Sequence, residues 1–166
     1  MKNKISFLKF EIINTTFIII FGFLSHYLYD LFDQNLFVGI ISPINESVWE
    51  HLKLIFFPTL ISIIIGYFYY KGIYFNYLKN KTIALIYSLI FIIVSFYTYT
   101  GIIGHHFLII DILIFIISCI FIFFYSLNKI NYNYYSNNKV YIFILVFLIL
   151  LFLIFTFYPL DINLFK

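Results

Sequence analysis

Five long stretches of the chain lack Lys, Asp and Glu and consist mainly of apolar residues. A helix needs about 20 mainly apolar residues to cross roughly 30 Å of hydrocarbon. Each stretch has about this length, so each predicts a membrane-spanning helix. The helices need not match the stretches residue by residue, because a helix can extend a few turns into the flanks or end earlier. We predict helices over about 7–29, 43–70, 82–100, 105–127 and 140–158.

The composition agrees with a chain that is solvated by lipid. Of its 166 residues, 64% are hydrophobic and 10% are charged, against about 45–50% and 25% in soluble domains. So few charged side chains cannot cover the surface of a soluble fold. We therefore expect an all-α, polytopic membrane protein in which residues 1–166 form a single transmembrane helical domain.

Two further features of the composition narrow the class of protein. Cys119 is the single cysteine, which excludes a disulfide framework and a multi-cysteine metal site. All ten basic residues are lysine, so the bidentate arginine contacts typical of nucleic-acid recognition are absent from the sequence. We expect the lipid bilayer as the main partner, and no nucleic acid.

The lysines predict the orientation in the membrane. Eight of the ten fall on one side of the predicted helices, and the positive-inside rule places that side in the cytoplasm. This gives a cytoplasmic N-terminus, five crossings and an external C-terminus. The eight are Lys2, Lys4, Lys9, Lys71, Lys79, Lys81, Lys129 and Lys139.

The acids and histidines gather in the opposite half. Among the acids, only Glu11 lies near the lysines. Acidic residues contribute little to topology, so their gathering requires a separate cause. The outer set comprises Asp30, Asp33, Glu46, Glu50, Asp111 and Asp161, with His26, His51, His105 and His106.

The first predicted helix carries one polar stripe. Its members recur every three or four residues, so they share one face, which we expect to turn toward the bundle. The stripe could be packing between helices or the lining of a cavity. His26 and Asp30, four residues apart, could form a ligand pair, an acid/base pair or a simple hydrogen bond. The members are Glu11, Asn14, Thr15, Ile18, Gly22, Ser25, His26, Tyr29 and Asp30.

The segment 42–53 is the richest in candidate chemistry. Ser42-Pro43 is typical of a helix start, although Asn45 could cap a shorter helix. On one helix, Glu46, Ser47, Glu50, His51 and Lys53 would share an arc, with Trp49 as an interface anchor.

Glu46 and Glu50 would repel one another on that helix unless a cation, a proton or Lys53 compensates. Three interpretations stay open: acids that complement the helix dipole, a metal or proton site, and a surface that binds a partner.

Asp111 stands in an apolar run, where a charge costs about 3 kcal/mol or more. It is either protonated, as a structural hydrogen-bond donor, or paired with His26, His51, His105, His106 or Lys53. His105 and His106 close an expected tight outer turn at 98–106 and are adjacent, so at most one should join a cluster. The last predicted helix has Thr156 as its only polar interior residue and should be peripheral.

Two resemblances follow from these residues. The strings Asn45-Glu46-Ser47-Val48-Trp49-Glu50-His51-Leu52-Lys53 and Tyr97-Thr98-Tyr99-Thr100-Gly101, with Asp111-Ile112-Leu113, resemble an uncharacterised family of small bacterial multi-pass membrane proteins of unknown function. The gathering of His, Asp, Glu and Ser near one membrane face is weakly similar to intramembrane zinc hydrolases. Those enzymes have seven helices and a His-x-x-x-His pair, which this chain lacks.

Three functions remain open from the sequence. The first is an outward-facing site for zinc or another divalent ion in a membrane-embedded hydrolase, with His26, His51, His105, His106 and Asp111 as ligand candidates. Glu46 or Glu50 would then act as general base. The second is a small proton-coupled transporter that uses the polar face, which includes Glu11, Asn14, Asp30 and Ser47. The third is a non-enzymatic protein that binds a membrane partner or a second copy of itself.

Overall fold

The described part of the chain contains helices and no strands. The computed structural model describes residues 2–70, 73–130 and 136–165, and the side chains from residue 5 onward. Five helices are long and three are short. The long ones are α1 (Lys2–Leu31), α4 (Lys53–Tyr70), α5 (Tyr77–Ile103), α6 (Leu108–Lys129) and α7 (Asn138–Phe157), and the short ones are α2 (Leu36–Ile41), α3 (Val48–His51) and the 3₁₀ turn η1 (Asn163–Phe165).

Within the described residues, five segments are long and apolar enough to cross a membrane, which confirms the predicted all-α membrane fold. The segment built from α3 and α4 counts as one of them. Large apolar side chains are exposed along the long helices, as expected where lipid is the solvent. The five segments are Ile5–Leu31, Val48–Tyr70, Tyr77–Ile103, Leu108–Lys129 and Asn138–Phe157. The predicted orientation stays a prediction, and Lys71 and the side chains of Lys2 and Lys4 lie outside the described residues.

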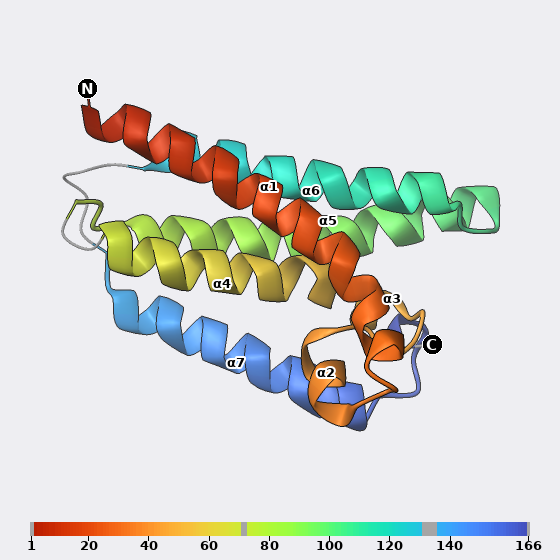
Figure 1. The fold of residues 1–166 in the computed structure, drawn as a ribbon. Coiled ribbons are helices and arrows are strands. Elements are labelled where there is room, and N and C mark those ends of the chain that lie inside the picture. The colour runs from red at the N-terminus through yellow and green to blue at the C-terminus, as the bar shows by residue number, and fades with distance from the viewer. Residues whose placement is uncertain (1, 71–72, 131–135, 166) are drawn as a thin grey trace.

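The long helices run side by side, with α1 crossing obliquely over the others (Figure 1). Helix α1 packs against α4 and α6, and α5 packs against α6, α4 and α7. The two ends of this bundle differ. The end with the start of α1, the end of α4 and the end of α6 is called the lysine end below, and the end with α2, α3, η1 and the α5–α6 turn is called the acidic end (Figure 1).

The apolar core is centred on α4. Ile55, Phe56 and Ile63 of this helix are fully buried, and they pack in one cluster with residues of α1, α5, α6 and α7. Gly22 lets α1 approach α4 closely, because a Cβ there would lie 2.7 Å from the Leu54 carbonyl oxygen. The predicted inward face of α1 is therefore held against the bundle.

The helix expected from residue 43 begins later. Its first turn is α3, which starts at Val48, and the Ser47 hydroxyl caps it by accepting from the Glu50 amide at 3.4 Å. Ser42 is not its cap, since it ends α2, an element that the sequence pattern did not predict. Glu46 and Ser47 therefore lie in the loop before the helix rather than on the expected arc.

The tight turn expected at 98–106 is also shorter than predicted. Helix α5 continues to Ile103, and the chain reverses from Gly104, whose φ of +91° lies in the left-handed region that glycine tolerates. The other long helices begin and end within about five residues of the expected positions. The result places His105 and His106 in the turn itself, before α6 begins.

Candidate metal centre

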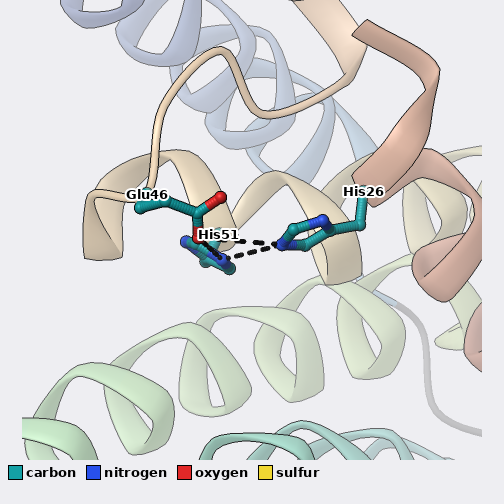
Figure 2. A group of neighbouring side chains, drawn as sticks. All are labelled: His26, Glu46 and His51. Carbon is teal, nitrogen blue, oxygen red and sulfur yellow. Dashed lines mark hydrogen bonds and ion pairs between the residues drawn. The ribbon is translucent and has the colours of Figure 1, made fainter. Parts of the chain in front are cut away.

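Three of the candidate side chains meet at the acidic end. His26 comes from the last part of α1, Glu46 from the loop after α2, and His51 from α3, and each offers one ligand atom within 4.8 Å of the others. Figure 2 shows the two imidazole rings and the carboxylate turned toward a common centre. Among the described residues this is the one group of three or more His, Cys, Asp or Glu with such spacing. We call it the His–Glu–His group.

The contacts within the group are short. The Nε2 atoms of His26 and His51 are 3.1 Å apart, and His51 Nε2 is 3.3 Å from Glu46 Oε2. His26 Nε2 is 3.9 Å from the same carboxylate oxygen. Two ligands at about 2.0–2.1 Å from a tetrahedral zinc ion would be roughly 3.3 Å apart. The group therefore has nearly the spacing that a divalent ion requires.

The ring of His51 is oriented by the loop that precedes it. Its Nδ1 lies 2.9 Å from the Ser47 carbonyl oxygen, and a carbonyl can only accept, so Nδ1 carries the proton. The lone pair of a neutral His51 is then on Nε2, the atom that faces His26 and Glu46. Histidines that ligate metals are commonly oriented by such a contact of the other ring nitrogen.

The group is also accessible. The side chains of His26 and His51 are 31% and 32% exposed, and that of Glu46 is 82% exposed. Three protein ligands leave a coordination position for water or substrate on a four-coordinate ion. The arrangement can therefore offer a Lewis acid with one open position at the surface of the bundle.

Glu50, the other candidate base, lies apart from this group. Its side chain is 2% exposed, and both of its carboxylate oxygens accept hydrogen bonds. Oε2 accepts from Lys53 Nζ at 2.6 Å and from the Ile44 amide at 3.0 Å, and Oε1 accepts from the Thr156 hydroxyl at 3.0 Å. The sequence left open whether a cation, a proton or Lys53 compensates the two glutamates. In the structure, Lys53 pairs with Glu50.

Asp111 and the remaining histidines form a separate arrangement at the α5–α6 turn. Asp111 accepts a hydrogen bond from the Tyr99 hydroxyl and lies 3.3 Å from His106 Nδ1. The Tyr99 oxygen in turn accepts from the Phe107 amide at 3.2 Å. The ring of His105 instead contacts that of Phe107, with centroids 4.5 Å apart and the planes tilted by 57°. The structure does not bring these residues into the His–Glu–His group; local partners account for the aspartate in its apolar run.

The polar stripe of α1 is divided. At the lysine end, Glu11 is buried and pairs with Lys81 of α5 at 2.5 Å. Toward the acidic end, Ser25 is buried while Asp30 is exposed, and His26 contacts His51 and Glu46. Between them lie Ile18, which is fully buried, and the close-packed Gly22.

Several partners were missed by reasoning from the sequence. Tyr99, Thr156 and Lys81 each donate to a carboxylate that the sequence singled out. The short turn between the two helices could have pointed to Tyr99, because it folds α6 back on α5 and brings Asp111 close to the end of α5. Thr156 was noted only as the one polar residue inside the last helix, and Trp49, expected at an interface, packs on Phe152 of that helix and on Phe165.

The comparisons with known proteins agree with the uncharacterised family that the sequence resembles. A family model described as a family of unknown function, DUF6512, matches residues 1–166. No curated protein and no solved structure matches the chain. A model that spans the whole chain assigns the family, and the protein belongs to DUF6512.

Proposed function

We propose that this membrane protein holds a divalent metal ion in the His–Glu–His group, and that the ion activates water for hydrolysis. Zinc is the ion that the ligand set favours. The observation that carries the proposal is the convergence of three ligand atoms from three separate segments, with His51 Nε2 left as a lone-pair donor by its Nδ1 contact to Ser47. Two imidazoles and one carboxylate, with a position open, suit catalytic zinc.

The residues of this chain would divide the chemistry as follows. The two histidines and one oxygen of Glu46 would hold the ion, which lowers the pKa of a bound water. The second Glu46 oxygen would take the proton as that water adds to an electrophilic centre, and would return it to the leaving group as the bond to that group breaks. Glu50 is not assigned this role, because both of its oxygens already accept hydrogen bonds.

The substrate would reach the ion at the membrane surface. His26 belongs to one membrane-spanning segment and His51 to the first turn of another, so the open position would lie near the end of the first segment and the start of the second. A substrate that partitions into the bilayer interface would meet the ion there. A lipid-derived ester or amide is the substrate class that this placement favours.

Metal content tests the proposal. Protein purified in detergent without a histidine tag or chelator should contain about one equivalent of zinc or another divalent ion by elemental mass spectrometry. His26→Ala, Glu46→Ala and His51→Ala should each lose the ion. His105→Ala and His106→Ala are matched controls, because these histidines lie outside the group, and they should keep it. A wild-type protein that is folded and takes up no divalent ion would overturn the proposal.

The transporter alternative uses the polar stripe of α1 as a path. The buried Ile18 and the close contact of Gly22 with the Leu54 carbonyl separate the polar residues at its two ends. This division favours the metal site over a continuous path. Flux of protons into proteoliposomes that is abolished by Glu11→Gln would favour transport instead.

A further inference from the structure

A buried set of hydrogen bonds lies directly behind the His–Glu–His group. Its centre is the ion pair of Lys53 and Glu50, whose side chains are 0% and 2% exposed. Lys53 Nζ donates to the carbonyl oxygens of Gly39 at 2.7 Å and Ser42 at 3.3 Å, besides Glu50. An ammonium has three hydrogens to donate, so all of them have acceptors. We call this ion pair, with Ser42 and Thr156, the buried hub.

The hub ties together the three segments that carry the ligands. The Ser42 hydroxyl donates at 2.8 Å to the carbonyl of Ser25, the residue before His26. Glu50 accepts from the amide of Ile44, two residues before Glu46, and is itself the residue before His51. Each ligand therefore lies within two residues of a group that the hub holds.

Helix α7 joins the hub through one residue. The Thr156 hydroxyl donates to Glu50 Oε1 at 3.0 Å and is 5% exposed. Thr156 is 106 positions from Glu50 in the sequence, so this bond fixes the carboxylate against a distant helix. Without it, one oxygen of a buried carboxylate would lose this hydrogen-bond partner, which is unfavourable for a charged group away from water.

We propose that the buried hub positions the metal ligands, with Thr156, Ser42, Glu50 and Lys53 as positioning residues that touch no ion themselves. This inference rests on the proposed function and extends it from the three ligands to the groups that fix their geometry. Contacts to groups behind the ligands typically change metal affinity by 10- to 100-fold when they are removed. Without these bonds, the loop that carries Glu46 would be held only at its ends. Its carboxylate could then move away from the two imidazole rings.

Thr156 offers the cleanest test, because its variants differ little in volume. Thr156→Val removes the hydroxyl and keeps the shape, so zinc affinity should fall about tenfold, measured by competition with a chelating dye. Thr156→Ser keeps the donor and should bind zinc within about twofold of the wild type. Thr100→Val is the matched control, since the Thr100 hydroxyl bonds within its own helix to the Phe96 carbonyl, and it should leave the affinity unchanged.

A second readout does not need the metal. In metal-free protein labelled with ¹⁵N at its four histidines, the spectrum of His51 should show a single tautomer with the proton on Nδ1. Thr156→Val should mix the two tautomers of His51, whereas the signals of His105 and His106 should not change. The unfolding midpoint of the same samples reports any general loss of stability.

The outcomes separate the two proposals. Unchanged zinc affinity and an unchanged His51 spectrum in Thr156→Val would overturn the positioning role, even if its unfolding midpoint falls. A wild-type protein that shows the His51 tautomer and its dependence on Thr156, yet takes up no divalent ion, would retain the positioning role and overturn the metal proposal. Reduced affinity and mixed tautomers in Thr156→Val, both restored in Thr156→Ser, support the inference.

Discussion

The protein contains two buried lysine–glutamate pairs that differ in how well they are satisfied. Lys53 and Glu50 are three residues apart, and the lysine and both oxygens of the glutamate have further hydrogen-bond partners. Lys81 and Glu11 are 70 residues apart and join α5 to α1. In the described part of the chain, Glu11 Oε1 is buried without a hydrogen-bond partner.

The difference shows what each pair contributes. Burial of two charges costs several kcal/mol per ion, and only good geometry with additional hydrogen bonds offsets it. The pair at the acidic end has those bonds: three join it to backbone atoms of Gly39, Ser42 and Ile44, and one comes from the hydroxyl of Thr156. The pair at the lysine end joins two helices and leaves part of its hydrogen-bonding capacity unused. The first pair therefore holds together the segments around the His–Glu–His group, whereas the second links α1 to α5.

The largest difference between the two pairs is expected in the free energy of unfolding when each pair is replaced by apolar residues. Glu50→Leu with Lys53→Met would leave the Gly39 and Ser42 carbonyls, the Ile44 amide and the Thr156 hydroxyl without these partners, so the free energy of unfolding should fall by at least about 3 kcal/mol. Glu11→Leu with Lys81→Met should be neutral or stabilise by about 1–4 kcal/mol. Unfolding in detergent by denaturant measures both, and equal losses from the two replacements would refute the comparison.

A smaller change in stability is expected from a substitution at Gly22, where α1 packs closely on α4. A Cβ at Gly22 would lie 2.6 Å from the Phe115 ring and 2.7 Å from the Leu54 carbonyl oxygen, so Gly22→Ala should destabilise by about 1–3 kcal/mol. Gly101→Ala is the control, because nothing lies within 4 Å of its Cβ position, and it should stabilise by up to about 1 kcal/mol. A neutral Gly22→Ala would show that α1 does not pack on α4 this closely.

The smallest effect should be that of the Glu11–Lys81 pair on metal binding. Glu11→Gln removes a charge from the far end of the α1 stripe, and the packed Ile18 and Gly22 lie between it and His26. Zinc content and affinity should therefore equal those of the wild type by elemental analysis and dye competition. A loss of zinc in Glu11→Gln would show that the two ends are coupled and would contradict their separation.

The membrane fold could be predicted from the sequence because length and apolarity act locally. Each run of about 20 apolar residues can satisfy its backbone in lipid only as a helix. The start of the second long helix was placed too early because Ser42-Pro43 resembles a helix start, whereas the Ser42 hydroxyl donates to the Ser25 carbonyl and Ser47 caps the helix instead.

The candidate site was predicted only in its residue types. His26, Glu46 and His51 were among the candidates by shared depth in the membrane, but so were Asp111, His105 and His106, which depth alone cannot distinguish. What separates them is tertiary: the α2 loop folds back on α1 through Ser42, and the Tyr99 hydroxyl reaches Asp111 across the turn. Thr156 donates to Glu50 from 106 residues away, a distance at which periodicity carries no information.

Zinc X-ray absorption spectroscopy of the purified protein would test the metal site most directly. The account predicts a first shell of two imidazole nitrogens at about 2.0–2.1 Å and carboxylate or water oxygens at about 2.0–2.2 Å. His51→Ala should lose the bound zinc, whereas His105→Ala should give the wild-type spectrum. A shell that contains the Cys119 sulfur at about 2.3 Å, or one that is unchanged in His51→Ala, would contradict the assignment of the ion to His26, Glu46 and His51.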